Sequence, residues 1–241
     1  GFSYGDEVTG PMPEIRQLDQ IRASLRDPHC EGPQEVYAIA MDVARMQDRE
    51  ELKKRMLFFG VVTYAAGRLG EEPVRSQGHI HRISLHSGWS PPELYEIWQG
   101  KAIIYMQEYV EDDPGRCFAV IAGPGEKVLV PPGWGHATIS ADPDVPLTFG
   151  AWCDREYGFE YDAVRAHKGL AWYPLLQGNN VIWQHNPRYI PGRLQAVTPR
   201  QYTEFSITSA PVYQQFIEDP ARFQFISRPD KHPELWQNFH P

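Results

Sequence analysis

Two histidines separated by a single residue, His79 and His81, are the first side chains in the sequence whose types and spacing could do chemistry. They lie among short apolar runs that predict β-strands, in which side chains two residues apart project to the same face, about 7 Å apart. Two imidazoles on one face offer two nitrogen ligands to a metal ion. A metal site is expected only if further ligands come from elsewhere in the chain.

Two carboxylates follow in the strand-like run 93–98, at Glu93 and Glu96. Because they are three residues apart, they would point to opposite faces of a strand, so only one of them can face the histidines. Glu93 would share its face with Tyr95, and Glu96 would share its face with Trp98. The strand pattern alone leaves both carboxylates open as ligands.

A third histidine, His136, lies in the segment GEKVLVPPGWGHATIS, which spans residues 125–140. The run 127–130 predicts a strand, and the turn that begins with Pro131 and Pro132 restricts the backbone before the next strand starts. His136 would therefore occupy a reproducible position at the start of that strand. It is the natural remaining ligand.

Both segments resemble the two sequence motifs of the cupin superfamily. Gly125, Pro131, Gly133 and His136 have the spacing of the second motif, with Ser140 where the family usually has Asn. The pair of histidines, the carboxylate at 93 and the glycine at 100 resemble the first motif, with an insertion before the carboxylate. The interval from 93 to 100 fits the family, so the resemblance favours the first carboxylate over the second.

More narrowly, the segments SQGHIH, PELYEIWQGKAIIYMQ, VLVPPGWGHATIS, YDAVRAHKGL and HNPRY resemble the cupin-type glucose-6-phosphate isomerases. The resemblance implies an all-β fold, a cupin double-stranded β-helix or jelly-roll barrel, and a homodimer. It implies one divalent metal ion per subunit, iron, manganese, nickel or zinc, and the interconversion of glucose 6-phosphate and fructose 6-phosphate. The expected metal ligands are His79, His81, Glu93 and His136.

Isomerisation requires a proton to move between C1 and C2 of the open-chain sugar through a cis-enediol, or a hydride shift assisted by the metal. On the proton route we expect Glu93 to act as the base and Tyr95 as proton donor or orienting group; a pure ligand role for Glu93 is the alternative. The residues expected to contact substrate are Thr63, Ser76, Gly78 and Tyr161.

Four positions depart from the family pattern and leave open whether the sugar must be phosphorylated: Val62, Gln77, Cys153 and Phe159. Two other interpretations therefore stay open. One is another metal-dependent cupin enzyme, either an oxygenase or an isomerase of a non-phosphorylated sugar. The other is a cupin that binds a sugar without turning it over.

Composition and patterning set the wider frame. The formal net charge of −8, without a basic cluster, argues against nucleic-acid binding. No apolar run is long enough to span a membrane, no export signal is recognisable, and three scattered cysteines favour a reducing compartment, so we expect a cytoplasmic protein. We expect an N-terminal arm over 1–35 with a short helix at about 14–26, a barrel domain over 36–189, and a C-terminal extension over 190–241 with a helix around 212–217. The extension should pack on the core or on a partner subunit.

Overall fold

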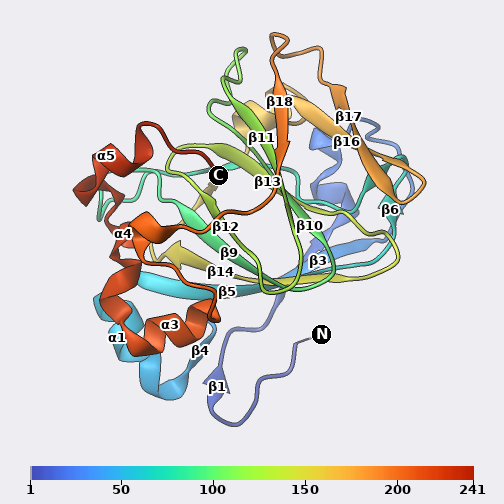
Figure 1. Ribbon diagram of the computed structural model, residues 1–241. Coiled ribbons are helices and arrows are strands. Elements are labelled where there is room, and N and C mark those ends of the chain that lie inside the picture. The colour runs from blue at the N-terminus through green and yellow to red at the C-terminus, as the bar shows by residue number, and fades with distance from the viewer. Residues whose placement is uncertain (1) are drawn as a thin grey trace.

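Strands whose side chains are mostly buried on both faces form two sheets, which face each other in the computed structural model of residues 2–241 (Figure 1). All neighbouring strands in the two sheets are antiparallel except β11 and β18, which are parallel. The predicted all-β jelly-roll fold is confirmed. The six-stranded sheet has the order β12 (Lys127–Val130), β9 (Glu93–Gln99), β14 (Leu147–Asp154), β5 (Leu57–Tyr64), β3 (Glu35–Ala40), β2 (Glu14–Gln17), and the four-stranded sheet has the order β13 (Gly135–Ser140), β10 (Ala102–Gln107), β11 (Cys117–Ala122), β18 (Leu194–Val197).

Short strand pairs and helices complete the chain. The pairs are β1 (Val8–Thr9) with β4 (Ala44–Arg45), β6 (Arg68–Leu69) with β7 (Glu72–Pro73), β8 (Ile80–His81) with β15 (Phe159–Glu160), and β16 (Trp172–Gln177) with β17 (Asn180–His185). The α-helices are α1 (Arg49–Lys54), α2 (Asp162–Ala166), α3 (Val212–Glu218), α4 (Gln224–Ser227) and α5 (Pro233–Trp236). No helix within residues 2–241 is long and apolar enough to cross a membrane.

The period-two pattern of β9 shows how the sequence divides the sheet faces. Tyr95 and Ile97 belong to the core between the two sheets, whereas Leu94 belongs to a second cluster on the outer face of the six-stranded sheet. Alternate residues of a strand project to opposite faces, so both faces of this sheet need an apolar cover. The core between the sheets buries one face, and other parts of the chain bury the other.

The C-terminal segment covers the outer face of the six-stranded sheet. Phe216 and Phe223 pack on Trp152 of β14, each with ring centroids 4.8 Å apart. Figure 1 shows α3, α4 and α5 along this side of the barrel, and the β16–β17 hairpin on the opposite side. The hairpin and α2 lie against the four-stranded sheet, where Trp183 contacts Tyr105. Each outer sheet face is therefore shielded by a later part of the chain.

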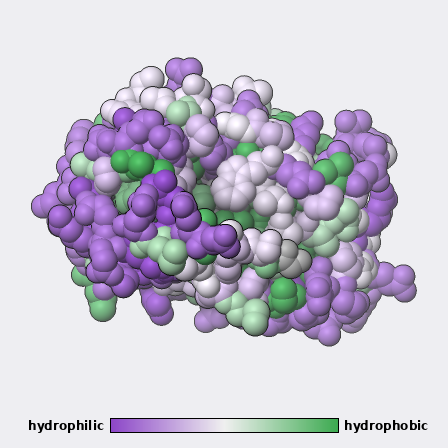
Figure 2. All heavy atoms as spheres, turned by 90° about the horizontal axis from the view of Figure 1, so that it is seen from below, coloured by the Kyte–Doolittle hydropathy of each residue, from purple (hydrophilic) through white to green (hydrophobic). Residues whose placement is uncertain are grey.

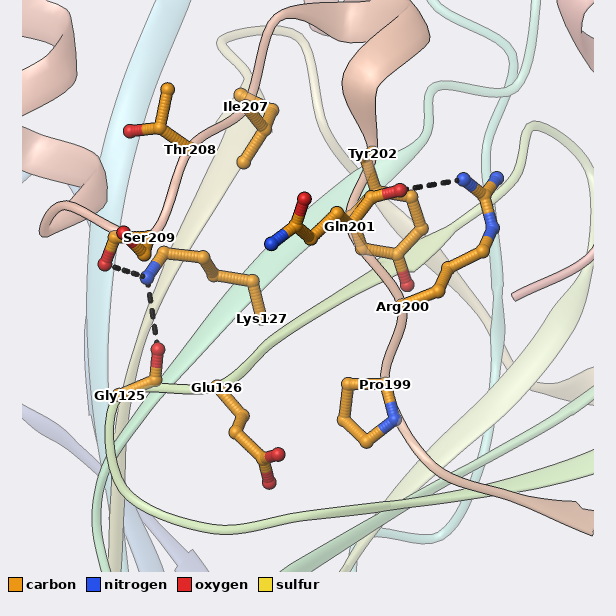
Figure 3. A pocket seen from close by; sticks show the side chains of 10 residues that line it. All are labelled: Gly125, Glu126, Lys127, Pro199, Arg200, Gln201, Tyr202, Ile207, Thr208 and Ser209. Atoms are coloured by element: carbon orange, nitrogen blue, oxygen red, sulfur yellow. Dashed lines mark hydrogen bonds between the residues drawn. The ribbon is translucent and has the colours of Figure 1, made fainter.

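Polar contacts fix the C-terminal segment to β12 (Figure 3). Lys127 Nζ donates hydrogen bonds to the carbonyl oxygens of Gly125 at 2.8 Å and Ser209 at 2.9 Å, and the backbone N–H of Leu129 donates to the Tyr202 hydroxyl at 2.9 Å. These contacts pair buried polar groups that would otherwise be costly to remove from water.

The N-terminal arm differs from the predicted helix over about residues 14–26. Residues 14–17 form the strand β2, which pairs with β3 at the edge of the six-stranded sheet. Two short 3-10 turns follow at Leu18–Gln20 and Arg22–Ser24. Sheet pairing overrides a weak local helix propensity here. The strand at this position matters for the site, because it brings its side chains to the barrel.

From below, hydrophilic residues cover much of the molecule, with hydrophobic side chains visible between them (Figure 2).

Candidate metal centre

Four side chains from distant parts of the sequence converge at one point inside the barrel: His79, His81, Glu93 and His136. One ligand atom of each lies within 4.8 Å of the ligand atoms of the others. Three imidazole nitrogens and one carboxylate oxygen form a donor set that suits several divalent transition metals. The four residues named by the sequence motifs are thus brought together.

The backbone of the two sheet edges holds the histidines in place. His79 and His136 face each other in an antiparallel bridge, with N–H to carbonyl hydrogen bonds of 3.0 Å and 2.9 Å running in both directions. His81 lies one residue pair further along, in β8, which is paired with Phe159 of β15. Because His79 and His81 are two residues apart, both rings project to one side, with centroids 5.1 Å apart.

Backbone carbonyls determine which ring nitrogens face the centre. His81 Nδ1 lies 2.8 Å from the carbonyl oxygen of Pro91, and His136 Nδ1 lies 3.0 Å from that of Trp134. A carbonyl only accepts, so each Nδ1 carries a proton and each Nε2 faces the cluster, where it can present a lone pair to a metal ion. Outer hydrogen bonds of this kind orient metal-binding imidazoles.

Two imidazole nitrogens at the centre lack protein partners that would satisfy them. Nε2 of His79 and of His81 is buried without a well-formed hydrogen bond, although Nε2 of His81 is 3.3 Å from Oε2 of Glu93. Buried lone pairs that face one another and a carboxylate are unfavourable unless a cation or proton lies among them. The geometry therefore fits a bound divalent metal ion.

The electrostatics of Glu93 and His79 agree with that arrangement. Burial alone would raise the pKa of Glu93, but hydrogen bonds from His136 and His81 outweigh it and hold this pKa well below its usual value. Burial, together with the neighbouring His136 and His81, holds the pKa of His79 well below its usual value. An ionised Glu93 and a neutral His79 are two of the protonation states that metal binding requires. At His81, Glu93 outweighs burial and raises the pKa, so a metal ion would displace a proton from this imidazole.

Two further groups contact Glu93. Tyr95 Oη donates a 2.8 Å hydrogen bond to Oε2 of Glu93, and Cys153 Sγ donates to Oε1 at 3.3 Å. Burial, followed by the negative charge of Glu93, raises the pKa of Tyr95 well above its usual value. Tyr95 therefore keeps its proton and acts as a donor toward the carboxylate.

A pocket opens onto His79 and Glu93. Its wall combines aromatic and aliphatic side chains with a small number of polar groups, a composition typical of small-molecule sites. Of the residues predicted to contact substrate, Ser76 and Tyr161 line it. The full lining is Arg16, Tyr37, Ile39, Met41, Val62, Tyr64, Ser76, Gln77, His79, Glu93, Tyr95, Thr138, Phe149, Ala151, Phe159 and Tyr161.

Thr63 differs from the prediction. Its neighbours Val62 and Tyr64 line the pocket, so Thr63, between them on β5, projects to the opposite face, where its hydroxyl hydrogen-bonds that of Thr148. The prediction failed because a one-residue change of register exchanges the sheet faces.

Gly78 precedes the first histidine but does not line the pocket. It has a φ of +86°, and a Cβ at this position would lie 2.9 Å from a side-chain atom of Leu170. Both features give this glycine a structural reason, because only glycine adopts such a backbone freely and leaves room for the neighbouring chain. A contact of Gly78 with substrate stays a prediction.

The structure separates the two carboxylates that the strand pattern left open. Glu96 lies on the outer face of β9, where it pairs with Lys127 at 3.2 Å and accepts a hydrogen bond from the Val212 N–H at 3.3 Å. It therefore connects the sheet to α3 and is not a member of the histidine cluster. Glu93 alone faces the histidines, as the motif spacing indicated.

Three polar residues of the pocket were not among the expected substrate contacts: Arg16, Gln77 and Thr138. Arg16 lay in a segment expected to be helical, and Gln77 was noted only as a departure from the family pattern. The order polar, apolar, polar at residues 14–16 was the available signal for a strand, but three residues are too few to distinguish the periods.

Comparisons with known proteins agree with the motifs. A sequence model of the family described as Glucose-6-phosphate isomerase (GPI) matches residues 23–191. The chain is similar to proteins named glucose-6-phosphate isomerase from Thermococcus litoralis, 28% identical over 155 residues, covering 64% of this chain and 71% of the relative. It is also similar to that from Pyrococcus furiosus, 27% identical over 191 residues, covering 76% and 90%.

Among solved structures, the chain is similar to an oxalate oxidase, with a TM-score of 0.39, 12% identity, and coverage of 53% of this chain and 56% of the other. It is also similar to vicilin from Corylus avellana, with a TM-score of 0.39, 11% identity, and coverage of 54% and 33%.

Proposed function

Because this chain belongs to the glucose-6-phosphate isomerase family, we propose that it interconverts glucose 6-phosphate and fructose 6-phosphate at the histidine–carboxylate cluster. The observation that carries the proposal is the convergence of His79, His81, Glu93 and His136 beside a pocket that His79 and Glu93 line. The motif resemblance and the family match support the same reaction.

A divalent metal ion held by these four residues would act as a Lewis acid, polarising the C1 carbonyl and the neighbouring hydroxyl of the open-chain sugar. Backbone carbonyls orient the rings of His81 and His136, so the Nε2 atoms of these two histidines are fixed before substrate arrives. Such preorganisation avoids reorganisation during the reaction. We propose iron, manganese, nickel or zinc as the ion.

In the proposed reaction, Glu93 removes the proton from C2 of the aldose and returns it to C1, which gives the ketose through a cis-enediol. Tyr95 donates to Glu93 in the structure, and it orients this carboxylate and exchanges a proton with the adjacent sugar oxygen. No net proton is gained or lost, as an isomerisation requires. A general base must be within hydrogen-bond reach of its proton, and Glu93 lines the pocket.

We also propose a homodimer and a cytoplasmic location. The three cysteines, Cys30, Cys117 and Cys153, are buried and unpaired, which supports a reducing compartment. The dimer rests on the family resemblance, and light scattering of the purified protein tests it.

The experiment for the proposed function is a coupled assay with fructose 6-phosphate and, in parallel, a panel of unphosphorylated aldoses and ketoses. Turnover of the phosphorylated sugar in proportion to bound metal supports the proposal. Turnover of an unphosphorylated sugar alone, or oxygen consumption without isomerisation, contradicts it.

A further inference from the structure

Two hydrogen-bond donors in the pocket wall are buried and unpartnered. They are Nε of Arg16 and Nε2 of Gln77, and both residues line the pocket that opens onto the histidine cluster. A buried donor without a partner is costly, so such a group in a binding pocket points to a ligand that completes it. The ligand side of that contact must carry acceptor atoms.

The strand β2 delivers Arg16 to this position. Arg16 is paired across the sheet with Tyr37 of β3, and the Arg16 side chain is only 17% exposed. Its Nη2 donates to Oε1 of Glu14 at 2.8 Å, and the side chain of Glu14 is 65% exposed. The outer side of the guanidinium thus contacts a solvent-exposed carboxylate, while its Nε remains free within the wall.

Gln77 is oriented by a second arginine. Arg165 Nε donates a 3.0 Å hydrogen bond to Oε1 of Gln77, which assigns the amide oxygen and leaves the NH₂ group as the free donor. The guanidinium of Arg165 also lies over the ring of Tyr161, 4.9 Å from its centroid. Both contacts restrain this part of the wall, so the Gln77 donor is set before a ligand binds.

The chemistry of these donors selects an anion. A guanidinium has only donors and a permanent positive charge, and its planar geometry suits phosphate and carboxylate oxygens. Charge-assisted hydrogen bonds of this kind are about twice as strong as neutral ones. Gln77 adds a neutral donor in the same wall, two residues before His79 of the cluster.

We propose that Arg16 and Gln77 form an anion subsite that binds the phosphate group of the sugar, with Arg16 as the main determinant of specificity for a phosphorylated substrate. This inference rests on the proposed function and extends it, because it states how the pocket distinguishes a sugar phosphate from the free sugar. The subsite supplies positive charge from the N-terminal strand to a chain of negative net charge.

The test measures binding by calorimetry on the metal-loaded protein with three probes that cannot be isomerised: inorganic phosphate, sorbitol 6-phosphate and sorbitol. Arg16→Gln should weaken binding of both phosphorylated probes by about 10- to 100-fold and leave sorbitol unchanged. Arg16→Lys keeps the charge without the planar fork and should give an intermediate loss. Unchanged affinity for sorbitol 6-phosphate in the correctly folded Arg16→Gln protein overturns the subsite.

Two matched variants separate binding from structure. Glu14→Gln breaks the same ion pair as Arg16→Gln but keeps the guanidinium, so phosphate affinity should hold or rise; a loss equal to that of Arg16→Gln would show that the ion pair, and not the anion contact, matters. Arg193→Gln removes one charge from an exposed arginine and should bind all probes as the wild type does. A weakening equal to that of Arg16→Gln would reduce the effect to net charge.

Kinetics distinguish this inference from the proposed function. With fructose 6-phosphate, Arg16→Gln should raise KM about tenfold or more and change kcat less, as expected for a contact made equally in the ground and transition states. A wild-type protein that binds sorbitol 6-phosphate through Arg16 without isomerising fructose 6-phosphate would overturn the function and keep the subsite. A wild-type protein that isomerises fructose 6-phosphate, together with an Arg16→Gln variant whose KM and kcat are unchanged, would keep the function and overturn the subsite.

Discussion

Tyr95 donates a 2.8 Å hydrogen bond from its hydroxyl to Oε2 of Glu93, two residues earlier on β9. The two side chains share one face of the strand, and the same carboxylate oxygen lies 3.3 Å from Nε2 of both His81 and His136. One oxygen thus connects the proposed proton donor to the proposed metal ligands. The proposed chemistry predicts a different phenotype for each member of the pair.

Glu93→Gln keeps the shape of the side chain and removes its charge and basicity. We expect kcat to fall by about 10²- to 10⁴-fold, the range of a general acid–base contribution, with the native fold retained. Metal content measured on the same sample separates the two roles: bound metal with lost turnover indicates the base, whereas loss of both indicates a ligand alone. An unchanged kcat would eliminate Glu93 as the base.

Tyr95→Phe removes only the hydroxyl from the Glu93 contact. Because Tyr95 is not in the histidine cluster, we expect full metal occupancy and a kcat about tenfold or more below wild type. Elemental analysis and steady-state kinetics on one preparation check this. A variant with wild-type kcat would leave Tyr95 as a packing residue of the core.

His136→Ala should lose the metal and, with it, turnover. The histidine supplies one of four ligand atoms and is held by both its backbone and its Nδ1 contact, so neighbouring groups cannot replace it. His86→Ala, in an exposed loop, is the matched control and should keep stoichiometric metal. Stoichiometric metal in His136→Ala would remove this residue from the site.

Chelation of the wild type followed by re-addition of Fe, Mn, Ni or Zn should restore activity to different degrees.

Glu96→Gln should affect stability much more than the chemical step. Glu96 and Lys127 form a buried ion pair at 3.2 Å on the face of β9 away from the cluster, and removing one partner leaves the other charge unpaired. We expect the free energy of unfolding to fall by about 3 kcal/mol, with kcat close to wild type below the unfolding transition. Chemical denaturation and the coupled assay measure the two effects. A large loss of kcat in folded protein would contradict the assignment.

Asp42 provides a pH-dependent test of the scaffold. Burial would raise its pKa, but hydrogen bonds and charges of Arg155 and Arg49 outweigh burial and hold the pKa below its usual value. The stabilisation is therefore present above the unfolded-state pKa and is lost as the pH falls through the folded-state pKa. Asp42 has a φ of +68°, which asparagine tolerates, so Asp42→Asn is the suitable variant.

The Asp42 pair is partly exposed, and solvent screening limits its contribution to about 0.5–1 kcal/mol. Asp42→Asn should therefore be less stable than wild type by this amount at neutral pH. The difference should shrink below about pH 4, where the carboxylate of the unfolded protein is protonated. Urea denaturation at several pH values measures it. A difference that grows on acidification would contradict the sign of the pKa shift.

The fold and the histidine cluster were predictable because each depends on strong local signals. Alternation and regular turns indicate the barrel strands, and the motif spacing brings three histidines and Glu93 together. The spacing also distinguished Glu93 from Glu96, which the strand pattern alone could not do. The structure agrees, since Glu96 bonds to Lys127 on the opposite face.

The pocket wall was harder to predict because it depends on register and on long-range pairing. Thr63 and Val62 are adjacent residues on β5, and only the folded structure shows that Val62 is the one that lines the pocket. Arg16 reaches the pocket because β2 pairs with β3, a contact that the local sequence does not specify. The C-terminal helix expected around 212–217 was found at Val212–Glu218, where the apolar pattern is clear.

The most direct test of the central claim combines two quantities on one purified sample: the rate of glucose 6-phosphate formation from fructose 6-phosphate, and the amount of bound divalent metal. We predict a rate that rises in proportion to metal occupancy, approaches saturation at one ion per chain and disappears on chelation. Full metal occupancy at His79, His81, Glu93 and His136 with no isomerisation of fructose 6-phosphate would contradict the account.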